Sequence, residues 1–113
     1  MEVDLDTTAR NGYVVVSVLG EIDVYTAPQL RERLIELIDQ GYYRIVVDLS
    51  RVEFLDSTGL GVLVGGLKRS RGHDGDLALV CSHPRIMKVF EVTGLNKVFS
   101  IGDSVEAVVA APS

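Results

Sequence analysis

Residues 44–67 read RIVVDLSRVEFLDSTGLGVLVGGL, and this stretch decides the fold. Residues 44–49 are almost continuously apolar, which is typical of a strand covered on both faces. The segment 56–61 then opens a helix that we expect to run to about Ser70. A buried strand followed by a helix predicts a parallel sheet covered by helices.

The same alternation extends to both ends of the chain. Asn11-Gly12 supplies the positive φ that a tight hairpin needs, and Gly41 and Gly94 are placed to end helices. The predicted strands cover residues 3–8, 13–19, 44–49, 77–81 and 98–101. The predicted helices run from Thr26 to Gly41, from segment 56–61 to Ser70, from Pro84 to Val92, and onward from Asp103. Thr26 and Asp103 are the predicted caps, with Gln29 and Glu106 completing capping boxes.

This order predicts a single α/β domain over residues 1–113, with a mixed, mostly parallel sheet of about five strands and four helices. The formal charge of −5 and the pI near 4.9 disfavour a nucleic-acid partner. No apolar run approaches the roughly 18 residues that span a bilayer, and the acidic start does not resemble a signal peptide. The single Cys81 is expected to be a buried thiol, so we expect a cytoplasmic protein with no membrane partner.

Enzyme motifs are absent from the sequence. Gly59 and Gly61 lack the third glycine of a dinucleotide-binding turn, and there is no phosphate-binding loop. Ser57 has only one of the two glycines of a nucleophile elbow. His73 and His83 do not have metal-ligand spacing with Cys81. We therefore expect no catalytic residues, no metal and no cofactor.

The helix that follows Ser57 has a costly composition. Gly59, Gly61, Gly65 and Gly66 each cost about 0.5–1 kcal/mol relative to alanine in a helix interior. Such a loss is usually offset by close approach to another surface. That surface is either the sheet or a second protein docking on nearly bare backbone, and the sequence leaves both open.

Ser57 itself has two interpretations. It is either an N-cap or an exposed hydroxyl at the rim of the domain that another enzyme can modify. A phosphate at a helix N-terminus is tolerated, because free amides and the helix dipole favour an anion. It would add roughly −1.5 to −2 charges beside Asp56 and oppose any partner surface shaped to a neutral serine.

Two segments resemble a known family. The residues Gly20-Glu21-Ile22-Asp23 and Phe54-Leu55-Asp56-Ser57-Thr58-Gly59-Leu60-Gly61 resemble hallmark segments of bacterial anti-sigma factor antagonists of the STAS domain family. The similarity extends to Val92-Thr93-Gly94-Leu95, and residues 62–68 look most like a developmental regulator of filamentous actinomycetes. The resemblance implies a STAS-type fold over nearly the whole chain.

The resemblance also implies a function and a site. Ser57 matches the phosphorylation site for an anti-sigma factor serine kinase that uses ATP, so this chain itself needs no cofactor. The unphosphorylated antagonist binds the kinase and frees a sigma factor, and a PP2C-type phosphatase reverses the phosphorylation. Asp23 matches an acidic position implicated in the kinase contact, and Thr58 stands where many members carry a second serine. We expect the partner-binding surface to include the residues Asp23, Asp56, Thr58, Gly59, Gly61 and Val62.

Two other classes compete with this interpretation. One is a non-switching STAS scaffold or ligand-sensing module in a larger signalling complex. The other is a receiver domain phosphorylated on aspartate, which Asp48 disfavours because it lies inside its predicted strand. The sequence does not identify the kinase, the sigma factor, the upstream stimulus or the oligomeric state, and it leaves open whether Thr58 is a second acceptor.

Overall fold

The computed structural model describes residues 2–110 and shows one five-stranded sheet with four α-helices. The strands lie in the order β1-β2-β3-β4-β5; β1 is antiparallel to β2, and the other neighbours are parallel. The elements are β1 (Val3–Arg10), β2 (Tyr13–Ile22), α1 (Ala27–Asp39), β3 (Arg44–Leu55), α2 (Ser57–Arg71), β4 (Asp76–Val80), α3 (Pro84–Thr93), the 3-10 helix η1 (Leu95–Lys97), β5 (Ile101–Gly102) and α4 (Val105–Ala110). The predicted mixed, mostly parallel α/β sheet is confirmed.

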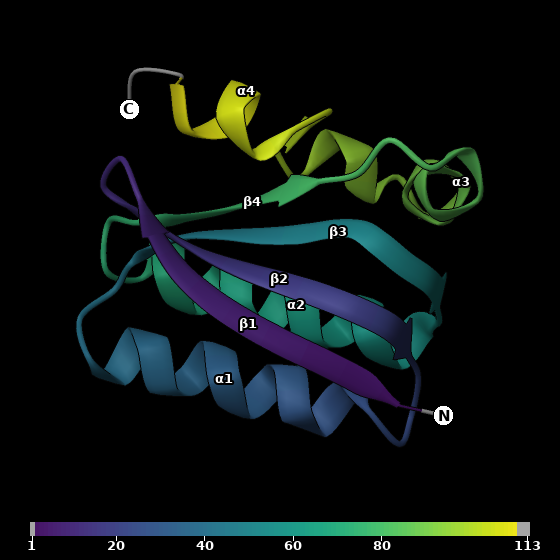
Figure 1. Ribbon diagram of the computed structural model, residues 1–113, viewed down its shortest axis with the longest axis horizontal. Helices are drawn as coiled ribbons and strands as arrows, with labels where there is room; N and C mark the ends of the chain where they lie inside the picture. Colours follow the sequence, from purple (N-terminus) through teal and green to yellow (C-terminus); the bar gives the residue numbers. More distant parts are fainter. Residues whose placement is uncertain (1, 111–113) are drawn as a thin grey trace.

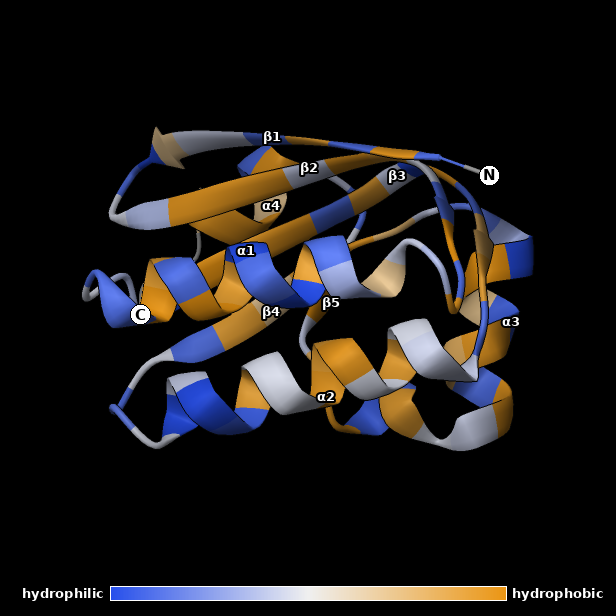
Figure 2. Ribbon diagram, turned by 90° about the horizontal axis from the view of Figure 1, so that it is seen from below, coloured by the Kyte–Doolittle hydropathy of each residue, from blue (hydrophilic) through white to orange (hydrophobic). Residues whose placement is uncertain are grey.

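The helices cover the two faces of the sheet unequally. Figure 1 shows α1 and α2 beneath the sheet and α4 above it. The main hydrophobic core includes Leu30 and Leu34 of α1 and Leu63 and Leu67 of α2, all buried. Figure 2 views this side and shows hydrophilic residues on the outward surface of α1. The second, smaller core places Val109 of α4 among buried valines of the sheet.

Three strands are longer than predicted, and β1 exceeds its predicted end at residue 8 only by running on to Arg10 at the hairpin turn. β3 continues to Leu55 instead of ending at residue 49, and β2 continues to Ile22 through Gly20, where a break was expected. The extension is a pairing effect, since Ile22 lies opposite Leu55 after two register shifts between β2 and β3. Gly20 has a φ of +119°, and a Cβ there would collide with the Glu2 carbonyl oxygen. Gly20, which the sequence suggested as a break, therefore permits close approach of the backbone of Glu2 and Val3.

The helix ends follow the glycines, but the caps differ from the prediction. Gly41 and Gly94 have positive φ and end α1 and α3 as expected. The Thr26 side chain makes no capping bond to α1, so its predicted capping box is wrong. The cap of α4 is also not Asp103, because the Ser104 hydroxyl accepts a hydrogen bond from the Ala107 amide at 3.1 Å.

The C-terminal half differs in two details. The last strand is shorter than predicted: Leu95–Lys97 form a 3-10 helix, and β5 contains only Ile101–Gly102. Cys81 follows β4 instead of lying within it and is 2 % exposed, so the buried thiol is confirmed. Burial is the main reason that the pKa of Cys81 is raised above its ordinary value.

Candidate functional site

The candidate site lies where two central strands end. β2 and β3 finish side by side at Ile22 and Leu55, and the Asp56 amide donates to the Ile22 carbonyl at 3.2 Å. Figure 1 shows α1 and α2 beginning at this same edge, on the right of the view. The loop after β2 and the first turn of α2 therefore share one end of the domain. The two segments that carry the family resemblance are adjacent in space.

Ser57 is the first residue of α2 and is exposed. The N-cap of the helix is Asp56, whose side chain accepts a hydrogen bond from the Gly59 amide at 3.1 Å. The interpretation of Ser57 as the cap is therefore wrong. Its hydroxyl is not required for capping and lies at the surface, where a partner enzyme can reach it.

The surroundings of Ser57 suit an added negative charge within the fold. α2 is 15 residues long and has no acidic residue in its first turn. The positive end of its dipole is therefore offset mainly by the Asp56 carboxylate at the cap. An anion on the Ser57 oxygen would face a favourable helix terminus, although Asp56 would oppose it at short range. We expect phosphorylation to be compatible with the folded state.

The glycines of α2 divide into two pairs with different surroundings. A Cβ at Gly59 would lie 2.5 Å from Leu55 Cδ1 and 2.7 Å from Ile22 Cγ2. A Cβ at Gly66 would lie 2.9 Å from Leu77 Cδ1. Gly59 and Gly66 are therefore needed for close packing within the domain.

The other two glycines have room for a side chain. A Cβ at Gly61 would meet nothing within 4 Å, and one at Gly65 only an Arg69 side-chain atom at 3.4 Å. The fold does not explain their lack of a side chain. Close approach within the domain therefore accounts for Gly59 and Gly66 but not for Gly61 and Gly65, for which docking of a second protein stays a prediction.

The other predicted contact residues on α2 differ in exposure. Thr58 and Gly61 are exposed and Val62 is half-buried, so all three can be contacted from outside. Gly59 is buried against the strand ends and contributes through packing. We define the docking rim as the exposed residues Ser57, Thr58 and Gly61 together with the half-buried Val62.

Asp23 is more deeply buried than expected of a contact residue. It is 5 % exposed, and its Oδ1 accepts from the amides of Tyr25 at 2.9 Å and Thr26 at 3.0 Å. The Thr26 hydroxyl in turn donates to the Glu21 carbonyl at 2.6 Å and accepts from the Asp23 amide at 2.9 Å. This network fixes the loop between β2 and α1. The other oxygen, Oδ2, is buried without a hydrogen-bond partner among the described residues.

Two opposing effects set the pKa of Asp23. Burial is the largest single effect and by itself raises the pKa. The hydrogen bonds from the Thr26 and Tyr25 amides and from the Thr26 hydroxyl favour the carboxylate and together outweigh burial. The net result is a pKa below the ordinary value of 3.8.

Asp23→Asn is expected to lower the melting temperature at pH 7. The lower pKa in the folded state means that the unfolded chain binds the proton more readily. The stabilisation from Asp23 is therefore fully present above a pH of about 4 and is lost as the pH falls through the folded-state pKa. Thermal melts should show a clear difference in melting temperature between the wild type and Asp23→Asn at pH 7, and a smaller difference at pH 3. A difference of equal size at both values would contradict this assignment of the carboxylate.

Sequence reasoning missed two exposed apolar side chains beside this network. Val24 is 57 % exposed and Tyr25 is 81 % exposed, in the loop that Asp23 fixes. Two apolar residues between a predicted strand and a predicted helix start are a signal that the sequence offers. Side chains in a loop are usually not buried, and exposed apolar side chains that lie together indicate a contact surface. The loop places them at the same edge as the docking rim.

The described residues contain neither a metal site nor a membrane span. Among residues 2–110, no His, Cys, Asp or Glu side chains come together in a group of three that could hold a metal ion. None of the helices in that part of the chain has the length and apolarity needed to cross a bilayer. The main feature of the candidate site is thus an exposed serine at the start of α2.

Comparison with known proteins identifies the family. The STAS domain family model matches residues 4–108, and the chain belongs to the STAS domain family. An anti-sigma-B factor antagonist of Staphylococcus aureus is 38 % identical over 106 residues, which cover 94 % of this chain and 98 % of the relative. These relatives are named for antagonism and not for a reaction, in agreement with the expectation that the chain is not an enzyme.

Solved structures show the same fold. An anti-sigma factor antagonist from Mycobacterium paratuberculosis superposes with a TM-score of 0.89 at 30 % identity, covering 96 % of this chain and 92 % of that one. The Bacillus cell fate determinant SpoIIAA, solved in its phosphorylated form, superposes with a TM-score of 0.71 at 27 % identity, covering 95 % and 96 %.

Proposed function

We propose that this chain is a cytoplasmic anti-sigma factor antagonist that is switched by phosphorylation of Ser57. Unphosphorylated, it binds an anti-sigma factor serine kinase and frees a sigma factor. The kinase uses ATP to phosphorylate Ser57 and ends the binding, and a PP2C-type phosphatase restores it. The observation that carries the proposal is an exposed Ser57 hydroxyl on the first turn of α2, with Asp56 in the capping role.

The relatives support this assignment. The staphylococcal relatives are named anti-sigma-B factor antagonists, and SpoIIAA has been solved in a phosphorylated form. The Bacillus protein and this chain share a fold over almost their full lengths.

The switch follows from the charge that phosphorylation adds. A phosphoserine carries roughly −1.5 to −2 charges at neutral pH. Within the free domain, the charge lies at a helix N-terminus and remains hydrated. In the complex, a partner surface shaped to neutral Ser57 would confront a dianion next to Asp56. A loss of about 2.7 kcal/mol in binding free energy is enough for a hundredfold weaker affinity.

The docking rim gives the partner bare backbone and small side chains. Gly61 lets a partner approach the helix closely, while Thr58 and Val62 border it. We assign Asp23 and Asp56 a positioning role: Asp23 holds the β2–α1 loop, and Asp56 caps α2. The exposed Val24 and Tyr25 extend the same surface and supply the apolar contact that interface centres favour.

Incubation with a cognate anti-sigma factor kinase and ATP tests the assignment of the acceptor. We expect intact-mass spectrometry to show the addition of one phosphate to the wild-type chain and none to Ser57→Ala. Thr58→Ala is the matched control, because it removes the neighbouring exposed hydroxyl on the same turn. This variant keeps Ser57 and should be phosphorylated like the wild type. Equal labelling of Ser57→Ala and the wild type would place the acceptor elsewhere. A chain that is never labelled but purifies within a large complex would instead indicate a scaffold.

A further inference from the structure

The first strand is an open edge of the sheet. Among the described residues, β1 pairs only with β2, in an unbroken register from Val3 opposite Gly20 to Arg10 opposite Tyr13. It contains no proline, glycine or bulge, and Figure 1 shows its outer side uncovered by any helix. Natural sheets usually blunt such edges with bulges, prolines, covering elements or charged side chains. Of these devices, β1 has only the charged side chains.

The hairpin turn determines which backbone groups point outward. Asn11 and Gly12 have φ values of 52° and 86°, which define a type I′ turn whose flanking residues Arg10 and Tyr13 are hydrogen-bonded. Because such pairs alternate along a strand, the even-numbered residues bond to β2. The hydrogen bond from the Glu21 amide to the carbonyl of the even-numbered Glu2, at 3.2 Å, is consistent with this alternation. The odd-numbered residues therefore direct their N–H and C=O groups away from the sheet, namely Val3, Leu5, Thr7 and Ala9.

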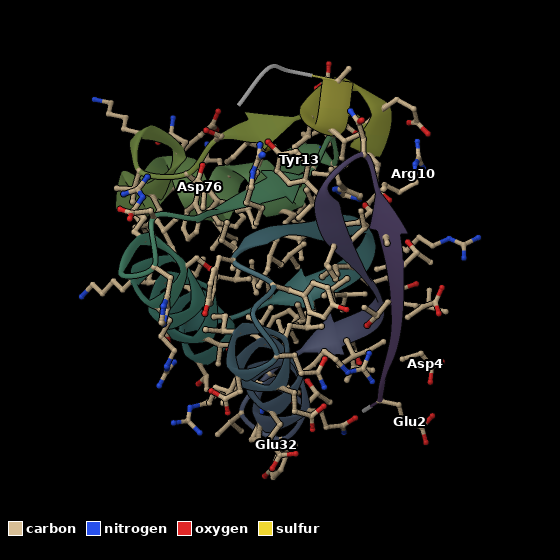
Figure 3. The ribbon with its side chains drawn as sticks, turned by 90° about the vertical axis from the view of Figure 1, so that its left-hand side faces the viewer. Glu2, Asp4, Arg10, Tyr13, Glu32 and Asp76 are labelled. Atoms are coloured by element: carbon tan, nitrogen blue, oxygen red, sulfur yellow. The ribbon has the colours of Figure 1, made fainter. Side chains whose placement is uncertain are left out.

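The charges on β1 are arranged asymmetrically. Asp4 and Asp6 lie toward one end and Arg10 at the other, and all three are exposed on one face of the strand. Figure 3 shows Asp4 and Arg10 along the rim that β1 forms, directed away from the body of the molecule. When a strand of this kind meets an antiparallel copy of itself, the acidic end of each copy faces the basic end of the other.

We propose that β1 pairs with β1 of a second copy, antiparallel about a two-fold axis at Thr7, to form a continuous ten-stranded sheet. In this register, the outward N–H and C=O groups of Leu5 bond with those of Ala9 in the second copy, and those of Ala9 bond with Leu5 of that copy. Asp4 lies opposite Arg10 of the second copy in a non-hydrogen-bonded pair, where side chains are closest. The two-fold axis makes this ion pair twice.

Neighbouring registers are less favourable. Only shifts that keep odd-numbered residues opposite odd-numbered ones bring the outward groups together. Centring the pairing on Asp6 places two like carboxylates face to face, which is destabilising. Centring it on Thr8 retains an opposite-charge pair but leaves Asp4 beyond the paired region. The register about Thr7 therefore combines the longest pairing with opposite charges.

Existing contacts of β1 are compatible with this pairing. The Thr7 hydroxyl accepts from Arg33 of α1 at 2.6 Å, on the lower face and not at the outer edge. Arg10 lies 3.5 Å from Glu106, but both side chains are largely exposed. Such a surface pair is weak and can exchange for a new partner. Ser57 follows β3, two strands from this edge, so the proposal does not depend on the phosphorylation switch.

Charge reversal combined with mixing tests the register. Sedimentation equilibrium of the wild-type chain should show a monomer–dimer equilibrium. Asp4→Arg and Arg10→Asp should each weaken dimerisation by about tenfold or more, because two pairs become repulsive. An equimolar mixture of the two variants should recover the wild-type dissociation constant, since every opposed pair is then of opposite sign. If Asp4 or Arg10 acted only through contacts within its own chain, mixing the two variants would not restore the wild-type dissociation constant.

A proline pair provides a second test that does not depend on charge. Ala9→Pro removes an amide that points away from β2, so the melting temperature should be almost unchanged and the dimer lost. Thr8→Pro removes an amide that bonds to β2 and should instead lower the melting temperature. A wild-type chain that stays monomeric to about millimolar concentration would overturn the proposal. So would dimers that persist unchanged in Ala9→Pro and in both charge-reversal variants.

Discussion

Gly59→Leu is expected to destabilise the fold by about 3 kcal/mol, at the upper end of the usual cost of overpacking a core. Even the first carbon of the new side chain would lie 2.5 Å from Leu55 Cδ1 and 2.7 Å from Ile22 Cγ2. Ile22 is β-branched and 1 % exposed, so it cannot move aside easily. Thermal denaturation should show a fall in melting temperature of more than about 10 °C.

Gly61→Leu is the matched control on the same helix. A side chain at this position meets nothing within 4 Å, and leucine is a better helix former than glycine. The melting temperature should therefore be unchanged or slightly higher, while binding to the anti-sigma factor kinase should be abolished. Similar losses of stability in both variants would contradict the division of the α2 glycines. Unchanged kinase binding by Gly61→Leu would remove Gly61 from the docking rim.

Ser57→Asp is expected to lower the affinity for the anti-sigma factor kinase by tenfold or more. The variant adds one negative charge beside Asp56 at the docking rim, a smaller charge than that of phosphate. The fold should remain intact, because an acidic residue in the first turn of a helix interacts favourably with the dipole. Isothermal titration calorimetry measures the affinity, and circular dichroism checks the fold.

Two variants control for the charge and for the loss of serine. Ser57→Ala should bind the kinase like the wild type, since it keeps the rim neutral. Ser100→Asp adds the same charge at an exposed position before β5, which lies two strands from β3 and level with its first half, and should also bind normally. Equal weakening by Ser57→Asp and Ser100→Asp would mean that net charge alone controls binding.

Local signals in the sequence were sufficient for most of the architecture. Gly41 and Gly94 were expected to end helices and do so through positive φ. The ends of β2 and β3 were not predictable, because they form by pairing with each other across register shifts. The polar residues Ser50-Arg51 locally predict the end of a strand. Only pairing with the neighbouring strand extends β3 beyond them.

The candidate site was predicted in outline but not in its internal contacts. The sequence placed Ser57 at a helix start, and the structure adds that Asp56 is the cap. Burial of Asp23 depends on how the loop folds back on its carboxylate, which spacing alone does not encode. The different roles of Gly59 and Gly61 depend on which side of α2 faces Ile22, so they required the packed structure.

Calorimetric titration of one anti-sigma factor kinase with three preparations of the wild-type chain tests the switch most directly. The preparations are the unphosphorylated protein, the protein phosphorylated on Ser57, and the phosphorylated protein after phosphatase treatment. We expect strong binding for the first and third and at least a hundredfold weaker binding for the second, with the same melting temperature for all three. Equal affinity of the phosphorylated and unphosphorylated proteins would contradict the account.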